Sequence, residues 1–327
     1  MRRKYISMTV FTALALSGCE SDRSKTPVTD IGAAPISTAS VKAMTSECVD
    51  LFTNGDYNSA LTICQIAAKK GDPIAQYTLG SMFIYGRGTS RDPGEAAKWW
   101  RKAADQEYAL AQSNLGRMYR KGDGIPQDYA KAVTWYRKAA VQGEPGAQND
   151  LGWMYYQGQG LTQDYAEAVK WYLKAAEQGR VSAQANLAWM YRKGQGVTQD
   201  YAEALKWYRK AAEQDYAWAQ NSLGVMYHEG EGVAEDHAEA IKWYRKAAEQ
   251  GFAWSLRHLG EMYRDGQGVT QDDVKALMLF ELAAAQGDNL SAKTRHTVAA
   301  EMTPADVSTA ERLARECGEK NYKGCGI

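Results

Sequence analysis

The feature that most constrains the fold of this chain is a repeat of 36 residues. A leucine recurs at that interval without insertion or deletion, at Leu79, Leu115, Leu151, Leu187, Leu223 and Leu259. A tryptophan keeps the same interval, at Trp99, Trp135, Trp171, Trp207 and Trp243. Fixed periods of about 20 to 50 residues are typical of solenoids, in which each unit buries its apolar face against its neighbours. The 327 residues therefore predict one elongated array rather than a single globular core.

One 36-residue unit predicts a pair of helices. Apolar residues follow helical spacing from Pro145 to Gln157 and again from Asp164 to Gln178, with Leu151, Met154, Tyr155 and Trp171 expected in the core. Gly158 and Gly160 can supply the positive backbone angles that end a helix, and Asp164 is a suitable N-cap for the second helix. No segment shows the alternation of a strand, so we expect an all-α fold.

The repeated unit resembles the Sel1-like repeat, a relative of the tetratricopeptide repeat, through the pattern A-x-x-x-L-G-x-M-Y-x-x-G-x-G-V-x-x-D-x-x-x-A-x-x-W-Y-x-x-A-A-x-Q-G. The resemblance covers six units at 73–288, preceded by a partial N-terminal capping repeat at 41–72 and followed by C-terminal capping helices at 289–327. It implies a right-handed α/α superhelical solenoid that binds other proteins on its concave side. The units depart from the pattern at three places, which are Ala188 for glycine, Ser255-Leu256 for Ala-Gln and Leu279-Phe280 for Trp-Tyr.

The first 40 residues predict export and lipid anchoring. Basic residues precede an apolar run, and Leu16-Ser17-Gly18-Cys19 matches the lipobox of bacterial lipoproteins. We expect a lipoprotein signal peptide at 1–18, lipidation of Cys19 and a flexible tether at 19–40. The alternative is an ordinary secretory signal with an incidental cysteine. The expected location is the periplasmic side of the cell envelope, where Glu20 after the acceptor cysteine favours the inner membrane in some bacteria and leaves the outer membrane as the alternative.

The other four cysteines lie at the two ends of the array. Because the periplasm oxidises thiols, we expect one disulfide between Cys48 and Cys64 and another between Cys317 and Cys325. Each could stabilise the fold by roughly 2 to 3 kcal/mol. A zinc site is the competing interpretation, but the pairs lack the short spacing of zinc ligands and lie far apart in the sequence.

Some helix positions vary among the six units, so packing within the repeat does not fix them. In each first helix they form a stripe opposite the apolar one, and in a superhelix of this kind the first helices line the concave surface. Four tryptophans fall on this stripe, beside arginines and a tyrosine that have the composition of a binding hot spot. We expect a partner to contact Arg117, Arg120, Asn149, Trp153, Tyr156, Trp189, Arg192, Trp218, Asn221 and Trp254. The alternative is that these tryptophans pack on neighbouring helices or on the ends of the array.

The composition excludes several functional classes. Lys plus Arg equals Asp plus Glu at 39 each, so no net charge attracts nucleic acid, and we expect no nucleic-acid partner. None of the four histidines has metal-ligand spacing, and the Gly-x-Gly loops lack the lysine of a phosphate-binding loop, so we expect no metal, no cofactor and no enzyme. A cell-wall or β-lactam hydrolase is the enzymatic alternative. The disulfide in every repeat of penicillin-associated Sel1-like proteins is missing.

The layout of lipobox, tether and single repeat array predicts a scaffold that is anchored in the envelope and binds a protein. Some Sel1-like lipoproteins of this layout are immunity proteins, which neutralise phospholipase effectors of type VI secretion systems. The resemblance thus implies that the partner is a secreted toxin or lipase effector, and that Cys19 carries the membrane anchor. A general periplasmic adaptor or a host-factor-binding lipoprotein is the alternative.

Overall fold

The computed structural model describes residues 37–327 as a continuous series of helices joined by short loops. The sixteen helices of this part of the chain are α1 Thr38–Asn54, α2 Tyr57–Lys69, α3 Pro73–Tyr85, α4 Pro93–Asp105, α5 Ala109–Lys121, α6 Tyr129–Val141, α7 Pro145–Gln157, α8 Tyr165–Glu177, α9 Val181–Lys193, α10 Tyr201–Ala212, α11 Ala217–Glu229, α12 His237–Ala248, α13 Ala253–Asp265, α14 Asp273–Ala285, α15 Asn289–Ala300 and α16 Pro304–Glu319. The all-helical prediction is confirmed.

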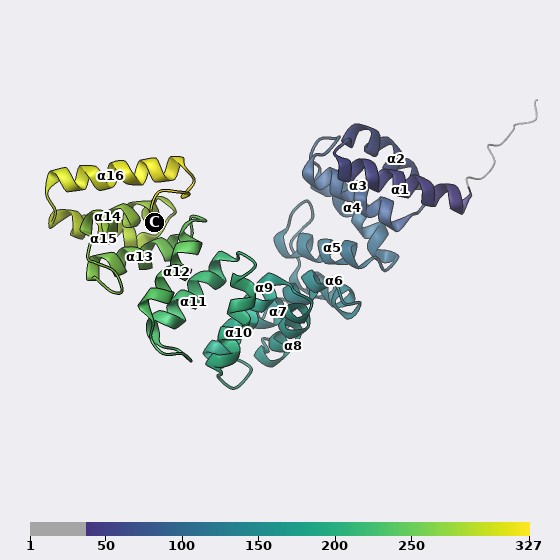
Figure 1. Cartoon of the computed structure of the whole chain (residues 1–327). Helices are drawn as coiled ribbons and strands as arrows, with labels where there is room; N and C mark the ends of the chain where they lie inside the picture. Colours follow the sequence, from purple (N-terminus) through teal and green to yellow (C-terminus); the bar gives the residue numbers. More distant parts are fainter. Residues whose placement is uncertain (1–36) are drawn as a thin grey trace, which may run out of the picture.

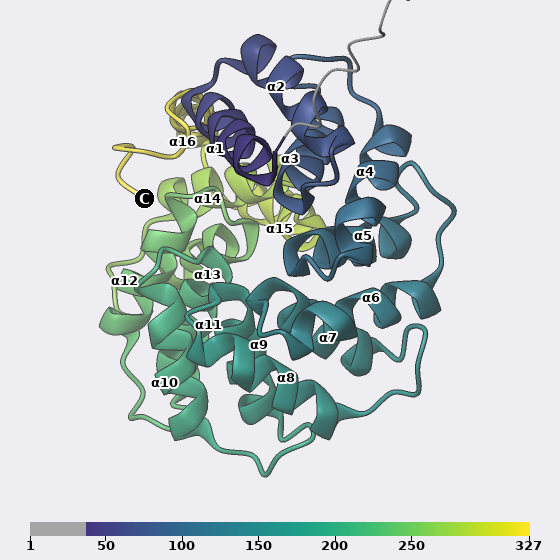
Figure 2. The same cartoon turned by 90° about the vertical axis from the view of Figure 1, so that its right-hand side faces the viewer.

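The helices stack as antiparallel pairs along a curved array (Figure 1). Figure 2 shows α5, α7, α9 and α11 on the inner side of the curve and α6, α8, α10 and α12 on the outer side. The two ends of the array overlap in that view, but Figure 1 separates α1 from α16 along the array. The first helix of each pair therefore lines the concave surface.

The helix boundaries follow from residues that recur in every unit. In the third repeat Asp164 is the N-cap of α8, and its carboxylate accepts a hydrogen bond from the Glu167 backbone N–H at 3.0 Å. Gly158 ends α7 at a φ of 68°, and Gly160 follows at 73°. A Cβ on Gly160 would lie 2.4 Å from the carbonyl of Tyr129, so only glycine fits where this loop crosses the preceding repeat. The predicted bounds of this helix pair are confirmed to within one residue.

In five of the six repeats an aromatic side chain of the second helix packs against a glycine of the first helix, and the fourth repeat has Ala188 at that position. In the third repeat Tyr172 is buried, and a Cβ on Gly152 would lie 2.8 Å from its ring. The glycine allows the ring to approach the first helix this closely. Tyr155 and Trp171, whose helical spacing predicted a place in the core, are instead half-buried, and the Lys174 ammonium lies 4.3 Å from the Trp171 ring centroid.

A ladder of glutamines joins successive repeats. Gln148 donates a hydrogen bond to the carbonyl of Ala140 in the preceding repeat and accepts one from Gln178 in its own. The same arrangement is centred on Gln76, Gln112, Gln184 and Gln220. In the sixth repeat Leu256 replaces this glutamine, and Gln286 donates instead to the hydroxyl of Tyr322. The C-terminal segment therefore provides the last polar partner of the ladder.

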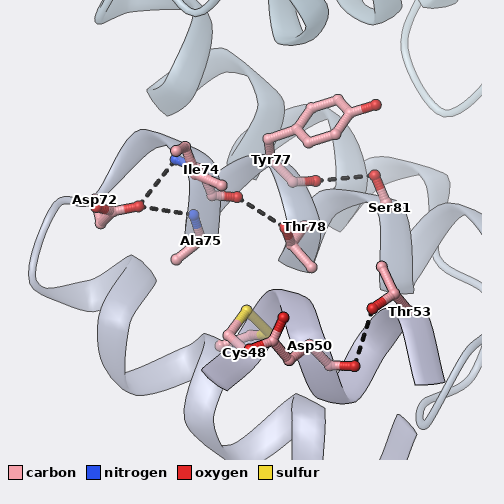
Figure 3. The surroundings of a disulfide bond; sticks show 10 residues. Cys48, Asp50, Thr53, Asp72, Ile74, Ala75, Tyr77, Thr78 and Ser81 are labelled. Atoms are coloured by element: carbon pink, nitrogen blue, oxygen red, sulfur yellow. Dashed lines mark hydrogen bonds between the residues drawn. A yellow bond between two sulfur atoms is a disulfide. The ribbon is translucent and has the colours of Figure 1, made fainter. Parts of the chain in front are cut away.

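Both expected cysteine pairs are disulfides in the structure. Cys48 of α1 and Cys64 of α2 are fully buried, with their Cα atoms 5.0 Å apart. Figure 3 shows this bond beside α3, whose N-cap Asp72 accepts hydrogen bonds from the backbone of Ile74 and Ala75. Cys317 of α16 is joined to Cys325, which holds the C-terminal turn against the last helix.

The predicted signal peptide, the lipidation site Cys19 and most of the predicted tether lie at residues 1–36, outside the described residues. Over residues 37–327, no helix combines the length and the apolar character needed to cross a membrane.

Candidate functional site: an aromatic hollow on the concave surface

The four variable tryptophans meet at one hollow of about 270 Å³ on the concave side. They come from the first helices of four successive repeats, with Trp153 on α7, Trp189 on α9, Trp218 on α11 and Trp254 on α13. Tyr156 of α7 lines the same hollow, and the rest of the wall is made by Tyr172, Asn186 and Met190. Residues spread over about 100 positions of sequence therefore form one aromatic surface because the repeat places them in a row.

The rings of the hollow support one another and still face solvent. The ring centroids of Trp189 and Trp218 lie 6.3 Å apart, and Trp218 also meets Tyr208 edge to face at 6.0 Å. Trp153, Trp189 and Trp218 are half-buried, whereas 49% of Trp254 is exposed. Trp153, Trp189 and Trp218 therefore pack on neighbouring helices with one side of the ring, as the alternative expected, and line the hollow with the other side.

Two of the tryptophan rings carry a cation. The guanidinium of Arg120 lies 5.0 Å from the Trp153 ring centroid, and the Lys193 ammonium lies 5.1 Å from that of Trp189. The lining of the hollow contains no carboxylate, and Asn186 is its one polar side chain apart from the ring N–H and hydroxyl groups. The site is therefore apolar with a basic rim.

A chain of hydrogen bonds fixes Asn186. Its amide nitrogen donates to Oδ1 of Asn149 at 3.1 Å, and the amide of Asn149 donates to Asp150 at 3.2 Å. Burial disfavours the charged carboxylate and raises the pKa of Asp150, against the opposing attraction of Arg120. Asn186 is thus a preorganised polar group in an otherwise apolar wall.

The structure corrects the roles expected for Asn149 and Asn221. Both are buried, and both accept a hydrogen bond from the next repeat. The donor to Asn149 is the Asn186 amide, and the donor to Asn221 is the Ser255 hydroxyl at 2.9 Å. Their position faces the adjacent first helix rather than the open concave surface. They hold repeats together and are not available to a partner.

The arginines divide into paired and unpaired groups. Arg192 is only 10% exposed and forms ion pairs with Glu229 and Glu231 of the next repeat, so its guanidinium is held between repeats, and its contact with a partner stays a prediction. Arg117 and Arg120 of α5 form no ion pair with the residues that the structure describes. Arg117 instead donates a hydrogen bond to Asn114 at 2.8 Å and remains half-buried at the concave surface.

Four residues of the site were missed by sequence reasoning. Asn186 occupies a variable position, where the six units read Thr78, Asn114, Asp150, Asn186, Ser222 and His258, and this variation was the available signal. Tyr172 and Met190 are conserved among the units of this chain for packing, which hides their second role. Lys193 was recognisable only from the neighbouring ring on which it lies.

Three of the four histidines gather on the C-terminal side of the hollow. The rings of His228 and His237 lie 5.0 Å apart, and His258 stacks on Tyr244 at 4.9 Å and contacts Glu261. Burial and the neighbouring imidazoles lower the pKa of His228. In the described part of the chain, no group of three or more His, Cys, Asp or Glu side chains has an arrangement that could hold a metal ion.

Comparison with known proteins identifies the repeat. The Sel1 repeat model matches residues 73–108, 109–144, 145–179, 181–216, 219–252 and 255–288. A Sel1 repeat protein from Oxalobacter formigenes is 33% identical over 73% of this chain and 96% of that chain, with a TM-score of 0.69. A search of the curated proteins finds no match.

Two further solved structures are similar at lower TM-scores. The c5321 protective antigen of uropathogenic Escherichia coli is 29% identical over 87% of this chain and 78% of that chain, with a TM-score of 0.40. The immunity protein Pa5087 from Pseudomonas aeruginosa is 22% identical over 65% of this chain and 81% of that chain, with a TM-score of 0.43. The six matched repeats cover more than half of the sequence, so the chain belongs to the Sel1 repeat family.

Proposed function

We propose that this protein is a scaffold that binds a partner protein on its concave face, with the aromatic hollow as the anchoring site. One observation carries the proposal. Four tryptophans that the repeat does not dictate, Trp153, Trp189, Trp218 and Trp254, line one hollow and keep exposed surface there. Exposed aromatic clusters of this kind are typical of interaction sites rather than of free surface.

The size and chemistry of the hollow favour a side chain of a protein over a cofactor. About 270 Å³ lies below the range of roughly 300 to 1,000 Å³ of most small-molecule sites. An aliphatic or aromatic side chain would bury its surface against the indole rings, while Asn186 could bond to the backbone beside it. Tryptophan and tyrosine lose little conformational entropy on binding, since their short side chains are already held by neighbours.

Photo-crosslinking in the native cells tests this proposal. A photoreactive benzoylphenylalanine in place of Tyr156 should capture a partner, whereas the same group in place of Tyr201, at the start of the outer helix α10, should not. Adding Trp153→Ala and Trp189→Ala should lower the captured amount at least about tenfold, as expected for hot-spot residues. Equal capture from both positions, or capture unaffected by the two substitutions, would contradict the proposal.

We further propose that the scaffold is anchored in the envelope and acts as an immunity protein. The layout of lipobox, tether and a single repeat array supports this function, because an immunity protein at the membrane meets a toxin at its target. The partner would then be a phospholipase effector delivered by a type VI secretion system. The alternative of a general periplasmic adaptor differs only in the partner.

Two measurements separate these alternatives. Labelling with palmitate should be lost in Cys19→Ala, and persistent absence of label in the unaltered chain would contradict the anchor. Co-expression with a phospholipase effector encoded beside its gene should relieve the lethality of that effector, and should fail with Trp153→Ala/Trp189→Ala. Unrelieved lethality in the presence of the folded scaffold would contradict the immunity function and leave the adaptor.

A further inference from the structure

We infer that the segment bound at the aromatic hollow is an acidic one, with carboxylates next to its apolar anchor and directed toward α5. This inference rests on the proposed function and specifies the chemistry of the partner. It comes from the charges around the hollow, which differ between its two ends.

The N-terminal end of the hollow is basic. Arg117 of α5 occupies the repeat position that Trp153 and Trp189 occupy in α7 and α9, so it continues their row by one helix. Lys121, also on α5, is exposed and lines, with Arg117, a second depression between α3 and α5. Neither forms an ion pair within residues 37–327, and the one carboxylate of that depression, Asp123, is bonded to Arg91 at 3.1 Å. These two cations are available to a partner.

The C-terminal end of the hollow has carboxylates, most of which are paired with a cation. Glu229 and Glu231 pair with Arg192, and Glu261 pairs with Arg257 and His258. Glu229 keeps 52% of its side chain exposed. An acidic segment would be repelled here and attracted at α5, which gives the bound segment one direction along the concave surface.

A cationic guest does not suit the hollow, although tryptophan cages often bind cations. Arg120 already lies over the Trp153 ring and Lys193 over the Trp189 ring, so a third positive charge would be placed beside two others. No carboxylate in the lining would offset that repulsion. The same cations would attract carboxylates that flank an apolar anchor.

A single-stranded nucleic acid would also bring negative charge and stacking surfaces, but the concave surface disfavours it. Its phosphates continue on both sides of any bound base. Beyond the hollow they would meet the exposed carboxylate of Glu229, and the whole chain has no net positive charge. An acidic protein segment can carry its carboxylates on one side of the hollow only, so it avoids that repulsion.

Peptide display on the purified full-length chain tests the inference. From a random 12-residue library, retained peptides should combine an aromatic or large aliphatic residue with at least two Asp or Glu residues nearby. A fluorescent copy of such a peptide should bind at least about tenfold more weakly to Trp189→Ala. The same loss is expected for Arg117→Glu/Lys121→Glu, since each substitution places a carboxylate opposite a carboxylate.

The matched control, Lys70→Glu/Lys293→Glu, reverses the charge of two exposed lysines at the ends of the array. It should change the affinity for the peptide less than about twofold. Retained peptides whose binding depends on Trp189 but which lack acidic residues would overturn this inference and leave the proposed function intact. The same holds for peptides whose binding is unchanged by Arg117→Glu/Lys121→Glu. A library without any Trp189-dependent peptide would contradict both. Tighter, Trp189-dependent binding of a 12-nucleotide oligothymidine would replace the acidic segment by a nucleic acid.

Discussion

The side-chain amide of Gln178 donates a hydrogen bond to Oε1 of Gln148 at 2.7 Å, and the amide of Gln148 donates to the Ala140 carbonyl at 3.1 Å. Gln148 is buried and connects the end of α6 to the end of α8. The carbonyls at the end of a helix have few partners within the helix, and Gln148 gives the Ala140 carbonyl a second donor beside the backbone N–H of Gly143 at 3.1 Å. The ladder makes neighbouring repeats depend on each other for polar contacts as well as for apolar ones.

Replacing Gln148 by leucine should destabilise the array by about 1 to 3 kcal/mol, since the Ala140 carbonyl loses its side-chain donor and the Gln178 amide loses its acceptor. The sixth repeat carries Leu256 at the equivalent position, which shows that the leucine side chain fits. Urea unfolding followed by far-UV circular dichroism measures the change. Gln157→Leu, at an exposed site on the same helix, should shift stability by less than about 0.5 kcal/mol; an equal effect of both would argue against the ladder.

The loop glycines allow a second test, because two of them differ only in their surroundings. Gly160 and Gly179 have φ angles of 73° and 83°, but a Cβ on Gly160 would overlap the Tyr129 carbonyl, whereas none of the surrounding atoms lies within 4 Å of a Cβ on Gly179. Gly179→Ala should cost about 1 kcal/mol for the left-handed backbone. Gly160→Ala should cost about 1 to 3 kcal/mol more, from steric overlap. Thermal unfolding of the two variants compares them, and similar losses would contradict the close approach of the loop to α6.

The raised pKa of Asp150 predicts that the stability of the fold depends on pH. Its pKa is raised in the folded state because burial disfavours the charged form, so the folded protein binds a proton more readily than the unfolded chain. Stability should therefore fall as pH rises from the ordinary carboxylate pKa through the raised one, and should stay lower above it. Neighbouring repeats carry Asn114 and Asn186 at the equivalent position.

Asp150→Asn should accordingly raise the urea midpoint at pH 7, and its advantage over the unaltered chain should shrink as the pH is lowered toward 4. Far-UV circular dichroism at several pH values provides the measurement. A lower midpoint at pH 7 would mean that the attraction between Asp150 and Arg120 outweighs the effect of burial. Asp50→Asn, at an exposed site on α1, is the control for the loss of one charge.

The helix pairs could be predicted from sequence because their determinants are local. Asp164, Gly158 and Gly160 each act within a few residues of themselves, and each recurs at 36 residues. The row of tryptophans was predictable for a related reason, since helical periodicity places each of them on the same face of its own helix. Stacking then brings them together without any further information.

The errors concern contacts between repeats, which depend on how closely successive helices approach. Asn149 was expected at the surface, but it lies where α9 covers α7 and bonds to Asn186. Arg192 was expected to contact a partner, and its ion pairs with Glu229 and Glu231, 37 and 39 residues away in sequence, were not foreseen. Period alone does not reveal which side chains can reach across that distance. Gln148 and Tyr172 recur in most units, and that recurrence does not reveal the hydrogen bonds of the first or the place of the second in the hollow.

Two substitutions distinguish a tryptophan that binds the partner from one that supports the fold. Trp207 lies on the outer helix α10 with 6% of its surface exposed, so Trp207→Ala should destabilise the array by about 3 to 5 kcal/mol. Trp189 already faces the open hollow on one side, and Trp189→Ala should cost less than half as much while removing partner capture at Tyr156. Urea unfolding and crosslinking, measured on the same two variants, give both quantities. If Trp189→Ala instead unfolded the array as readily as Trp207→Ala, packing on neighbouring helices would account for the tryptophan row, and the concave hollow would lose its support as a binding site.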